Sequence, residues 1–184
     1  MTQRLFVAVD CASLAESLAD LQTVLPDAGS LRRTDPEQAH VTLQFLGETP
    51  DDRVEPTAET VADTVGATGV DPFELTVAGV GAFPSREYIS VVWVGTANGS
   101  TQLDRLHEAV VDATTGLGFD EPDHAFTPHV TLGRMDDARG KTAVREFFDR
   151  EPTVGTVAVE AVELKRSVLG EGGPRYETVR RIDL

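Results

Sequence analysis

The word His-Val-Thr-Leu occurs twice in this chain, at residues 40–43 and at residues 129–132. Val-Thr-Leu favours a β-strand, because β-branched side chains pack well on a pleated surface. Each word follows a buried strand and an amphipathic helix, so the order strand, helix, motif strand runs twice along the chain. This repeated order predicts a fold made of two similar units.

The spacing of apolar residues predicts the elements of both units. In the first unit we expect a strand over residues 5–10, a helix that opens at Ser13 with capping-box spacing and runs to about Leu25, and the first motif strand. In the second unit we expect a strand over 88–94, a helix over 102–115 and the second motif strand. Further helices are expected over residues 51–64 and 142–149, and further strands over 73–80, 154–159, 162–168 and 176–182.

No low-complexity stretch or long linker separates the two units. Two lobes joined in this way pack closely instead of forming independent domains. We therefore predict a single bilobal domain over residues 1–184, built of two interleaved pseudo-repeats of about 1–87 and 88–184.

Length and composition indicate a globular protein, since 184 residues with 40% apolar side chains can build a sizeable core. The sequence shows no basic region followed by a long apolar stretch, and no window approaches a membrane span. We predict a cytoplasmic protein without a membrane partner. Cys11 is the only cysteine, which excludes an intramolecular disulfide and a cysteine-rich zinc site.

The chain carries 31 acidic and 16 basic residues, for a formal net charge of −15 at pH 7. Lys141 and Lys165 are its only lysines. An acidic surface poor in lysine favours solubility in strong salt, so we predict a halophilic source. In molar salt the Debye length is about 3 Å, and the negative charge then does not exclude RNA as a partner. An acidic mesophilic enzyme with a small neutral substrate is the alternative.

The two repeated words carry the residues from which we predict an active site. Residues two apart on a strand point to the same face, so His40 lies beside Thr42 and His129 beside Thr131. A single histidine on a strand is more often structural than catalytic. The repetition of this scarce residue at matching points of two units favours catalysis, with one imidazole as acid and the other as base.

The extended motifs, HVTLQFLG at residues 40–47 and FTPHVTLGR at 126–134, resemble the paired H-x-T-x motifs of the 2H phosphoesterase superfamily. Within it the chain is most similar to the RNA 2′,3′-cyclic phosphodiesterases, historically called 2′-5′ RNA ligases. The resemblance extends over nearly the whole chain through similar words at residues 4–10, 79–84, 92–95, 167–170 and 174–176. One departure is the segment Leu-Arg-Arg-Thr at residues 31–34, where the family often has an aromatic residue.

The resemblance implies an α+β fold that is bilobal and duplicated about a pseudo-two-fold axis. Each lobe would be a mainly antiparallel sheet flanked by helices, with the motif strands lining an active-site groove between the lobes. The expected partner is RNA with a 2′,3′-cyclic phosphate end, with tRNA fragments as one candidate source. We expect a monomer that needs no cofactor and no metal.

The implied reaction is hydrolysis of the cyclic phosphodiester to a 2′-phosphomonoester. By resemblance His40 is the proton donor to the 3′ oxygen and His129 is the proton acceptor on water; the pseudo-symmetry of the motifs leaves the reverse polarity open. The hydroxyls of Thr42 and Thr131 can donate to the two non-bridging phosphate oxygens.

Phe45 and Arg134 stand five residues after the two motif histidines. The resemblance implies substrate contacts, with the ring against a base and the guanidinium near phosphate. Strict alternation sends position five to the opposite face, so these contacts require a bulge or a strand end, which Gly133 would permit on the second side. The alternative places Phe45 in the core and Arg134 on the surface. His107 and His124 are predicted to be solvated surface residues.

Two other functions stay open at the level of sequence. One is a 2′-5′ RNA ligase that joins a 2′,3′-cyclic phosphate end to a 5′-hydroxyl end with the same residues. The other is a non-catalytic bilobal module that binds RNA or nucleotides. The intact histidines and threonines argue against the second.

Overall fold

A nine-stranded sheet, antiparallel at every pairing between its strands, runs through the computed structural model, which describes residues 1–27 and 29–184. The strands follow the order β7-β4-β5-β6-β3-β1-β8-β9, and β2 pairs with β6 off this path. The middle of the order is the contact between β3 (His40–Pro50) and β6 (His129–Met135). The two motif strands therefore lie side by side at the centre of the sheet.

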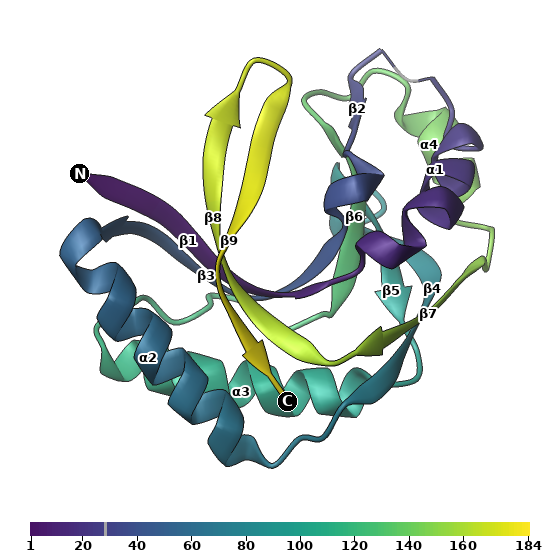
Figure 1. Cartoon of the computed structure of the whole chain (residues 1–184). Helices are drawn as coiled ribbons and strands as arrows, with labels where there is room; N and C mark the ends of the chain where they lie inside the picture. The colour runs from purple at the N-terminus through teal and green to yellow at the C-terminus, as the bar shows by residue number, and fades with distance from the viewer. Residues whose placement is uncertain (28) are drawn as a thin grey trace.

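The sheet divides into two lobes at this central contact. The first lobe consists of β1 (Thr2–Asp10), β3, β8 (Ala161–Gly170) and β9 (Gly173–Asp183). The second lobe consists of β4 (Phe73–Pro84), β5 (Ile89–Thr96), β6 and β7 (Thr153–Val159), with the short β2 (Leu31–Arg33). Figure 1 shows the sheet curling so that the β8–β9 hairpin rises on one side of the motif strands and β2 with the end of β6 rises on the other.

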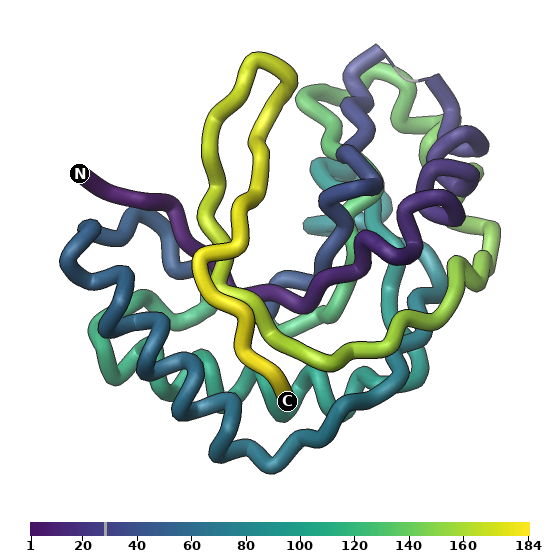
Figure 2. The backbone as a smooth tube through the Cα atoms, viewed as in Figure 1, coloured from purple at the N-terminus to yellow at the C-terminus, as the bar shows by residue number. Residues whose placement is uncertain are grey.

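Two helices, α1 and α3, are exchanged between the lobes. The long α2 (Asp51–Thr68) and α3 (Ser100–Gly116) pack against each other, and α3 also contacts β3 of the first lobe. The helix α1 (Ala15–Thr23) follows the 3₁₀ turn η1 (Ala12–Leu14) and contacts β7 of the second lobe. Figure 1 shows α4 (Lys141–Phe147) close to α1. The chain trace in Figure 2 follows the N-terminal segment from the first lobe across to α1 beside the second.

The main core lies between the sheet and these helices. Val41 and Val130, which are paired at the centre, are 0% and 1% exposed. Leu103, Leu106 and Val110 of α3 are fully buried, as their helical spacing predicts. The core face of the sheet thus holds the apolar residues of each motif strand and leaves the alternate residues for the other face.

The predicted α+β class, with mainly antiparallel lobes flanked by helices, is confirmed. Every long strand and helix forms close to its predicted bounds, and α2 continues past Pro56 as expected. The strand β2 was not predicted, because three residues with two exposed arginines give no periodic signal. The 3₁₀ turn η2 (Pro36–Gln38), another short element, leads into the first motif strand.

The halves of the sheet differ from the halves of the chain. β4 and β5 pair with each other although they lie on opposite sides of the predicted boundary at residue 87, and β8 and β9 join the first lobe. Each lobe of the sheet therefore contains strands from both halves of the chain. None of the helices in the described parts of the chain combines the length and the apolar character of a membrane-spanning segment.

Candidate active site

Four polar side chains of the motif strands share the sheet face opposite the main core, which we call the motif face. Val41 of β3 pairs with Val130 of β6 in antiparallel register. The next positions along that register set His40 across from Thr131 and Thr42 across from His129. The two histidines are then diagonal neighbours, a relationship that separates residues by about 7–8 Å. Such a spacing leaves room for one phosphate between the two rings.

The two motif strands also share one pattern of burial. Over residues 40–46 and 129–135 the order is half-buried, buried, half-buried, buried, buried, exposed, buried in both strands. The predicted pseudo-symmetry is therefore present in the environments of these side chains and not only in their sequence.

Each motif histidine is oriented by a backbone carbonyl two residues earlier in the chain. Nδ1 of His40 lies 2.8 Å from the carbonyl oxygen of Gln38, and Nδ1 of His129 lies 2.7 Å from that of Thr127. A carbonyl oxygen only accepts, so Nδ1 of each ring carries the proton and donates it. Nε2 of each ring is left for proton transfer.

Aromatic rings of each lobe hold the imidazoles from the side. Tyr176 of β9 meets His40 edge-on with centroids 5.0 Å apart, and Phe83 of β4 meets His129 edge-on at 4.8 Å. Phe6 of β1 lies 5.1 Å from His40. Sequence reasoning missed these packing residues, because apolar residues on strands carry no signal that separates core positions from ring contacts.

Burial lowers the pKa of both motif histidines. For His40 the burial is opposed by its hydrogen bond to Gln38, while the positive charges of Lys165, His129 and Arg134 lower the pKa further. For His129 burial is again the largest cause, opposed by the hydrogen bond to Thr127 and helped by Arg134. The neutral imidazole is thus favoured in the free protein, which suits a base, and an anionic ligand would raise the pKa of either ring.

A β-bulge occurs in each motif strand at the matching position. Val7 and Ala8 of β1 pair with Gln44 and Thr42, so Leu43 has no partner in β1. Val92 and Trp93 of β5 likewise pair with Gly133 and Thr131, so Leu132 has no partner in β5. An extra residue shifts the alternation by one position, as expected for contacts at the fifth residue after each histidine.

The bulges return Phe45 and Arg134 to the motif face. Phe45 is 69% exposed, and its ring lies 6.2 Å from that of Phe6, the neighbour of His40. Arg134 is exposed, and its charge acts on both motif histidines. At Gly133 a Cβ atom would lie 2.9 Å from the backbone oxygen of Arg32, so the close approach of β2 requires glycine there.

The remaining candidates fall outside the motif face. The prediction that His107 is a solvated surface residue is wrong. Its ring stacks on Phe126 with centroids 3.9 Å apart, and its Nδ1 donates to the carbonyl of Leu43 at 2.7 Å. The helical pattern around His107 gave no sign of this partner on a distant strand. His124 is exposed and pairs with Asp123, as predicted for a surface histidine.

The arginine pairs at residues 32–33 and 180–181 form ion pairs with nearby carboxylates. Arg32 contacts Asp136 at 2.7 Å, Arg180 contacts Glu55 at 3.4 Å, and Arg181 contacts Asp183 at 3.0 Å. Within the described ranges, no three side chains of His, Cys, Asp or Glu are grouped so that they could hold a metal ion.

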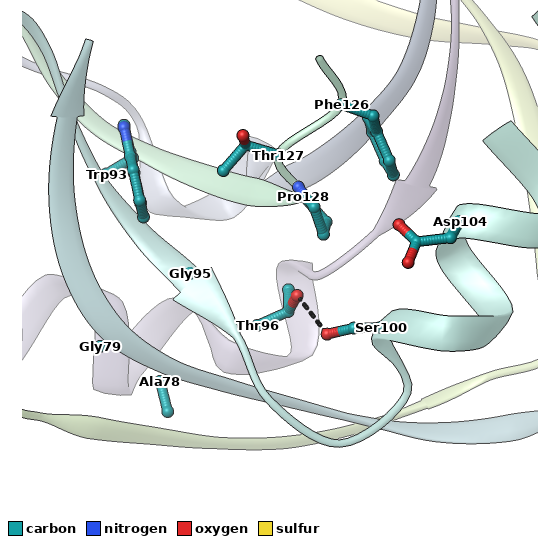
Figure 3. Close-up of a pocket in the computed structure, with 10 residues that line it drawn as sticks. All are labelled: Ala78, Gly79, Trp93, Gly95, Thr96, Ser100, Asp104, Phe126, Thr127 and Pro128. Atoms are coloured by element: carbon teal, nitrogen blue, oxygen red, sulfur yellow. Dashed lines mark hydrogen bonds between the residues drawn. The ribbon is translucent and has the colours of Figure 1, made fainter. Parts of the chain in front are cut away.

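A cavity of about 440 Å³ is lined by residues of β4, β5 and α3 and of the segment just before β6 (Figure 3). Gly95, which pairs with His129 in the sheet, is part of its lining, as are Thr127 and Pro128 just before His129. Asp104 of α3 contributes a carboxylate to the lining. Residues adjacent to His129 in the sequence and in the sheet therefore line this cavity.

Comparison with known proteins gives the family. The model of the family described as the 2′-5′ RNA ligase superfamily matches residues 12–171. A relative from Aeropyrum pernix called RNA 2′,3′-cyclic phosphodiesterase is 34% identical over 170 residues, with 90% of this chain and 93% of the relative covered. The chain belongs to the 2′-5′ RNA ligase superfamily. A second relative of the same name from Methanothermobacter thermautotrophicus is 33% identical over 180 residues, with 96% of each chain covered.

Solved structures of the superfamily share this fold. The protein TT0787 of Thermus thermophilus superposes with a TM-score of 0.77 at 26% identity, covering 98% of this chain and 97% of the other. LigT of Escherichia coli in complex with 3′-AMP gives a TM-score of 0.79 at 24% identity, with 100% and 99% covered. The predicted membership of the 2H phosphoesterases is confirmed.

Proposed function

We propose that this chain hydrolyses the 2′,3′-cyclic phosphate end of RNA to a 2′-phosphomonoester, without a metal ion, by acid-base catalysis from His40 and His129. The observation that carries the proposal is the pairing of Val41 with Val130, which sets one imidazole and one hydroxyl on each side of the strand contact. The names of the relatives at 33–34% identity support the same substrate class.

In the proposed complex the phosphate lies between the two motif strands. Thr42 and Thr131 donate hydrogen bonds to the two non-bridging oxygens, where negative charge is held in the transition state. Arg134 approaches the phosphate from the second motif strand, and Phe45 supports the terminal base with its exposed ring.

The proton transfers follow from the free Nε2 atoms. Nε2 of His129 takes a proton from water, the water oxygen bonds to phosphorus, and the bond from phosphorus to the 3′ oxygen breaks. Nε2 of His40 gives its proton to the departing 3′ oxygen. The negative phosphate raises the pKa of His40, which opposes the effect of burial and favours the protonated acid in the complex.

Ligation to a 2′-5′ linkage is the second candidate, which the description of the family model favours. A 5′-hydroxyl would take the place of water at His129, and microscopic reversibility requires the same residues in both directions. The high concentration of water makes hydrolysis the main reaction in our proposal. A non-catalytic binding module would have no need for two free Nε2 atoms beside two hydroxyls.

We further propose that residues 1–184 act as one bilobal domain and as a monomer, with RNA fragments such as those of tRNA as substrates. A cytoplasmic location and a halophilic source stay predictions.

The decisive experiment uses an RNA oligonucleotide that ends in a 2′,3′-cyclic phosphate, with a chelator present, at low and at molar salt. We expect the wild-type protein to open the ring, and His40→Ala and His129→Ala each to lose about 100- to 10,000-fold in rate. The exposed His124→Ala serves as the matched control with wild-type activity. The proposal is contradicted if the wild type does not open the ring, or if the variant that combines His40→Ala with His129→Ala keeps full activity.

Analysis of the product ends tests the direction of proton transfer separately. A 2′-phosphate agrees with His40 as the acid. A 3′-phosphate exchanges the roles of His40 and His129 and leaves the phosphodiesterase itself in place.

A further inference from the structure

The carbonyl of each bulge residue accepts a hydrogen bond from a helix side chain. Nδ1 of His107 donates to the carbonyl oxygen of Leu43 at 2.7 Å. Nε2 of Gln22 donates to the carbonyl oxygen of Leu132 at 2.9 Å. Leu43 and Leu132 are the residues that the strand register skips at matching positions of the two motifs, so a helix side chain supports each of these bulges. The carbonyl of Leu132 also accepts the backbone N–H of Thr34 at 3.0 Å.

The two contacts run crosswise between the pseudo-repeats. His107 lies on α3, in the second half of the chain, and holds the first motif strand. Gln22 lies on α1, in the first half, and holds the second motif strand. Equivalent contacts at equivalent carbonyls, made by different residue types, indicate that the anchor is required at each bulge while its chemistry is free to vary.

Each anchor also has a second contact near a motif residue. The ring of His107 stacks at 7° on Phe126, and Figure 3 shows Phe126 next to Thr127, whose carbonyl orients His129. The amide of Gln22, which is only 7% exposed, also donates to the carbonyl of Thr34 at 2.8 Å. Each anchor side chain is thereby held in one orientation.

We propose that His107 and Gln22 are positioning residues that fix the two bulges and so direct Phe45 and Arg134 onto the motif face. The inference rests on the proposed function, in which Phe45 and Arg134 contact the substrate. Without the anchor the bulge can move along its strand, and a move of one residue turns the fifth position to the opposite face.

Two substitutions of His107 separate the hydrogen bond from the stacking. His107→Phe keeps a ring over Phe126 and removes the donor, whereas His107→Asn places an amide N–H near the position of Nδ1 and removes the ring. We expect His107→Phe to raise KM for the cyclic-phosphate oligonucleotide on the order of tenfold with a smaller change in kcat, because a displaced Phe45 removes binding that is shared by the ground state and the transition state. His107→Asn is expected to restore KM.

Glu108→Gln, an exposed neighbour on α3, is the control and keeps wild-type KM. Thermal unfolding of every variant identifies those that have lost the fold. A His107→Phe protein with lowered stability and unchanged KM overturns the positioning role, because such a residue stabilises the fold alone. The positioning role is also overturned if His107→Asn raises KM as much as His107→Phe does.

Double variants test whether each anchor acts through its own target. His107→Phe has no further effect on KM when Phe45 is already alanine, and Gln22→Met has none when Arg134 is already alanine. The exchanged combinations, His107→Phe with Arg134→Ala and Gln22→Met with Phe45→Ala, are additive. Equal additivity in all four combinations contradicts the proposal. A wild type that leaves the ring closed contradicts the proposed function instead, so the two failures are distinct.

Discussion

The ring of Tyr176 stands edge-on to the ring of His40, with centroids 5.0 Å apart and 83° between the planes. Tyr176 also donates its backbone N–H to the side-chain oxygen of Gln38 at 2.8 Å, and the carbonyl of Gln38 orients His40. The strand β9 thus orients His40 in two ways, through the ring contact of Tyr176 and through the hydrogen bonds that link Tyr176 to Gln38 and Gln38 to His40.

We predict from this contact that Tyr176→Ala lowers kcat on the order of tenfold, because His40 gains freedom to turn away from the phosphate. Tyr176→Phe keeps the ring and is expected to keep kcat. Steady-state rates on the cyclic-phosphate oligonucleotide check both. Equal losses in the two variants would assign the effect to the hydroxyl and refute the ring contact as its cause.

The lowered pKa of both histidines predicts different pH profiles for the free protein and for the complex. The alkaline limb of kcat/KM follows loss of the acid's proton in the free protein, so it lies below the ordinary histidine pKa of 6.5. The bound phosphate raises the pKa of the acid, so the alkaline limb of kcat lies at higher pH. Rate measurements across acidic and neutral pH check the order of the two limbs, and coincident limbs contradict it.

The hydroxyl donors are tested by Thr42→Val and Thr131→Val, which keep the β-branched shape on the strand. Loss of a donor to a transition-state oxygen costs about 100- to 1,000-fold in kcat. We expect both variants to fall toward that range, since each hydroxyl donates to one non-bridging oxygen in the proposed complex. Thr156→Val, at an exposed position on β7, is the control. Wild-type kcat in either motif variant would remove that threonine from the proposed site.

The bulge at Gly133 makes a prediction for stability. Gly133→Ala sets a Cβ atom 2.9 Å from the backbone oxygen of Arg32 and 3.0 Å from the side chain of Leu31, and we expect it to lower the free energy of unfolding by about 1–3 kcal/mol. Gly66→Ala in α2 meets nothing within 4 Å and is expected to raise stability by about 0.5–1 kcal/mol. Denaturant unfolding measures both, and equal effects would contradict the close approach of β2.

The motifs and most elements were predictable because they depend on local patterns. Alternation identified the motif strands, and the strand order placed them at matching points of two units. The bulges at Leu43 and Leu132 were predictable only in part, from the spacing of Phe45 and Arg134. Gly133 suggested the bulge on the second side, whereas the first side has Gln44 and offered no such sign.

The contacts of His107 and of the aromatic rings around the two histidines could not be predicted from the sequence, because they join segments that are distant along the chain. Nothing near His107 indicates that its partner is the carbonyl of Leu43, which lies 64 positions earlier. The aromatic neighbours of the histidines come from β1, β4 and β9, which meet only after the sheet has closed. A helix pattern shows which side faces the core but not which lobe the helix will cover, so the exchange of α1 and α3 was hidden as well.

The pairing of β1 with both β3 and β8 has a consequence for how the protein is made. β1 is synthesised long before its second neighbour β8, which begins only at Ala161. Until that strand is synthesised, one edge of β1 has no partner and Tyr176 is not yet present beside His40. A nascent chain therefore carries both motifs before it has the environment that we propose makes them act, and activity toward RNA should begin only after β8 and β9 have been synthesised.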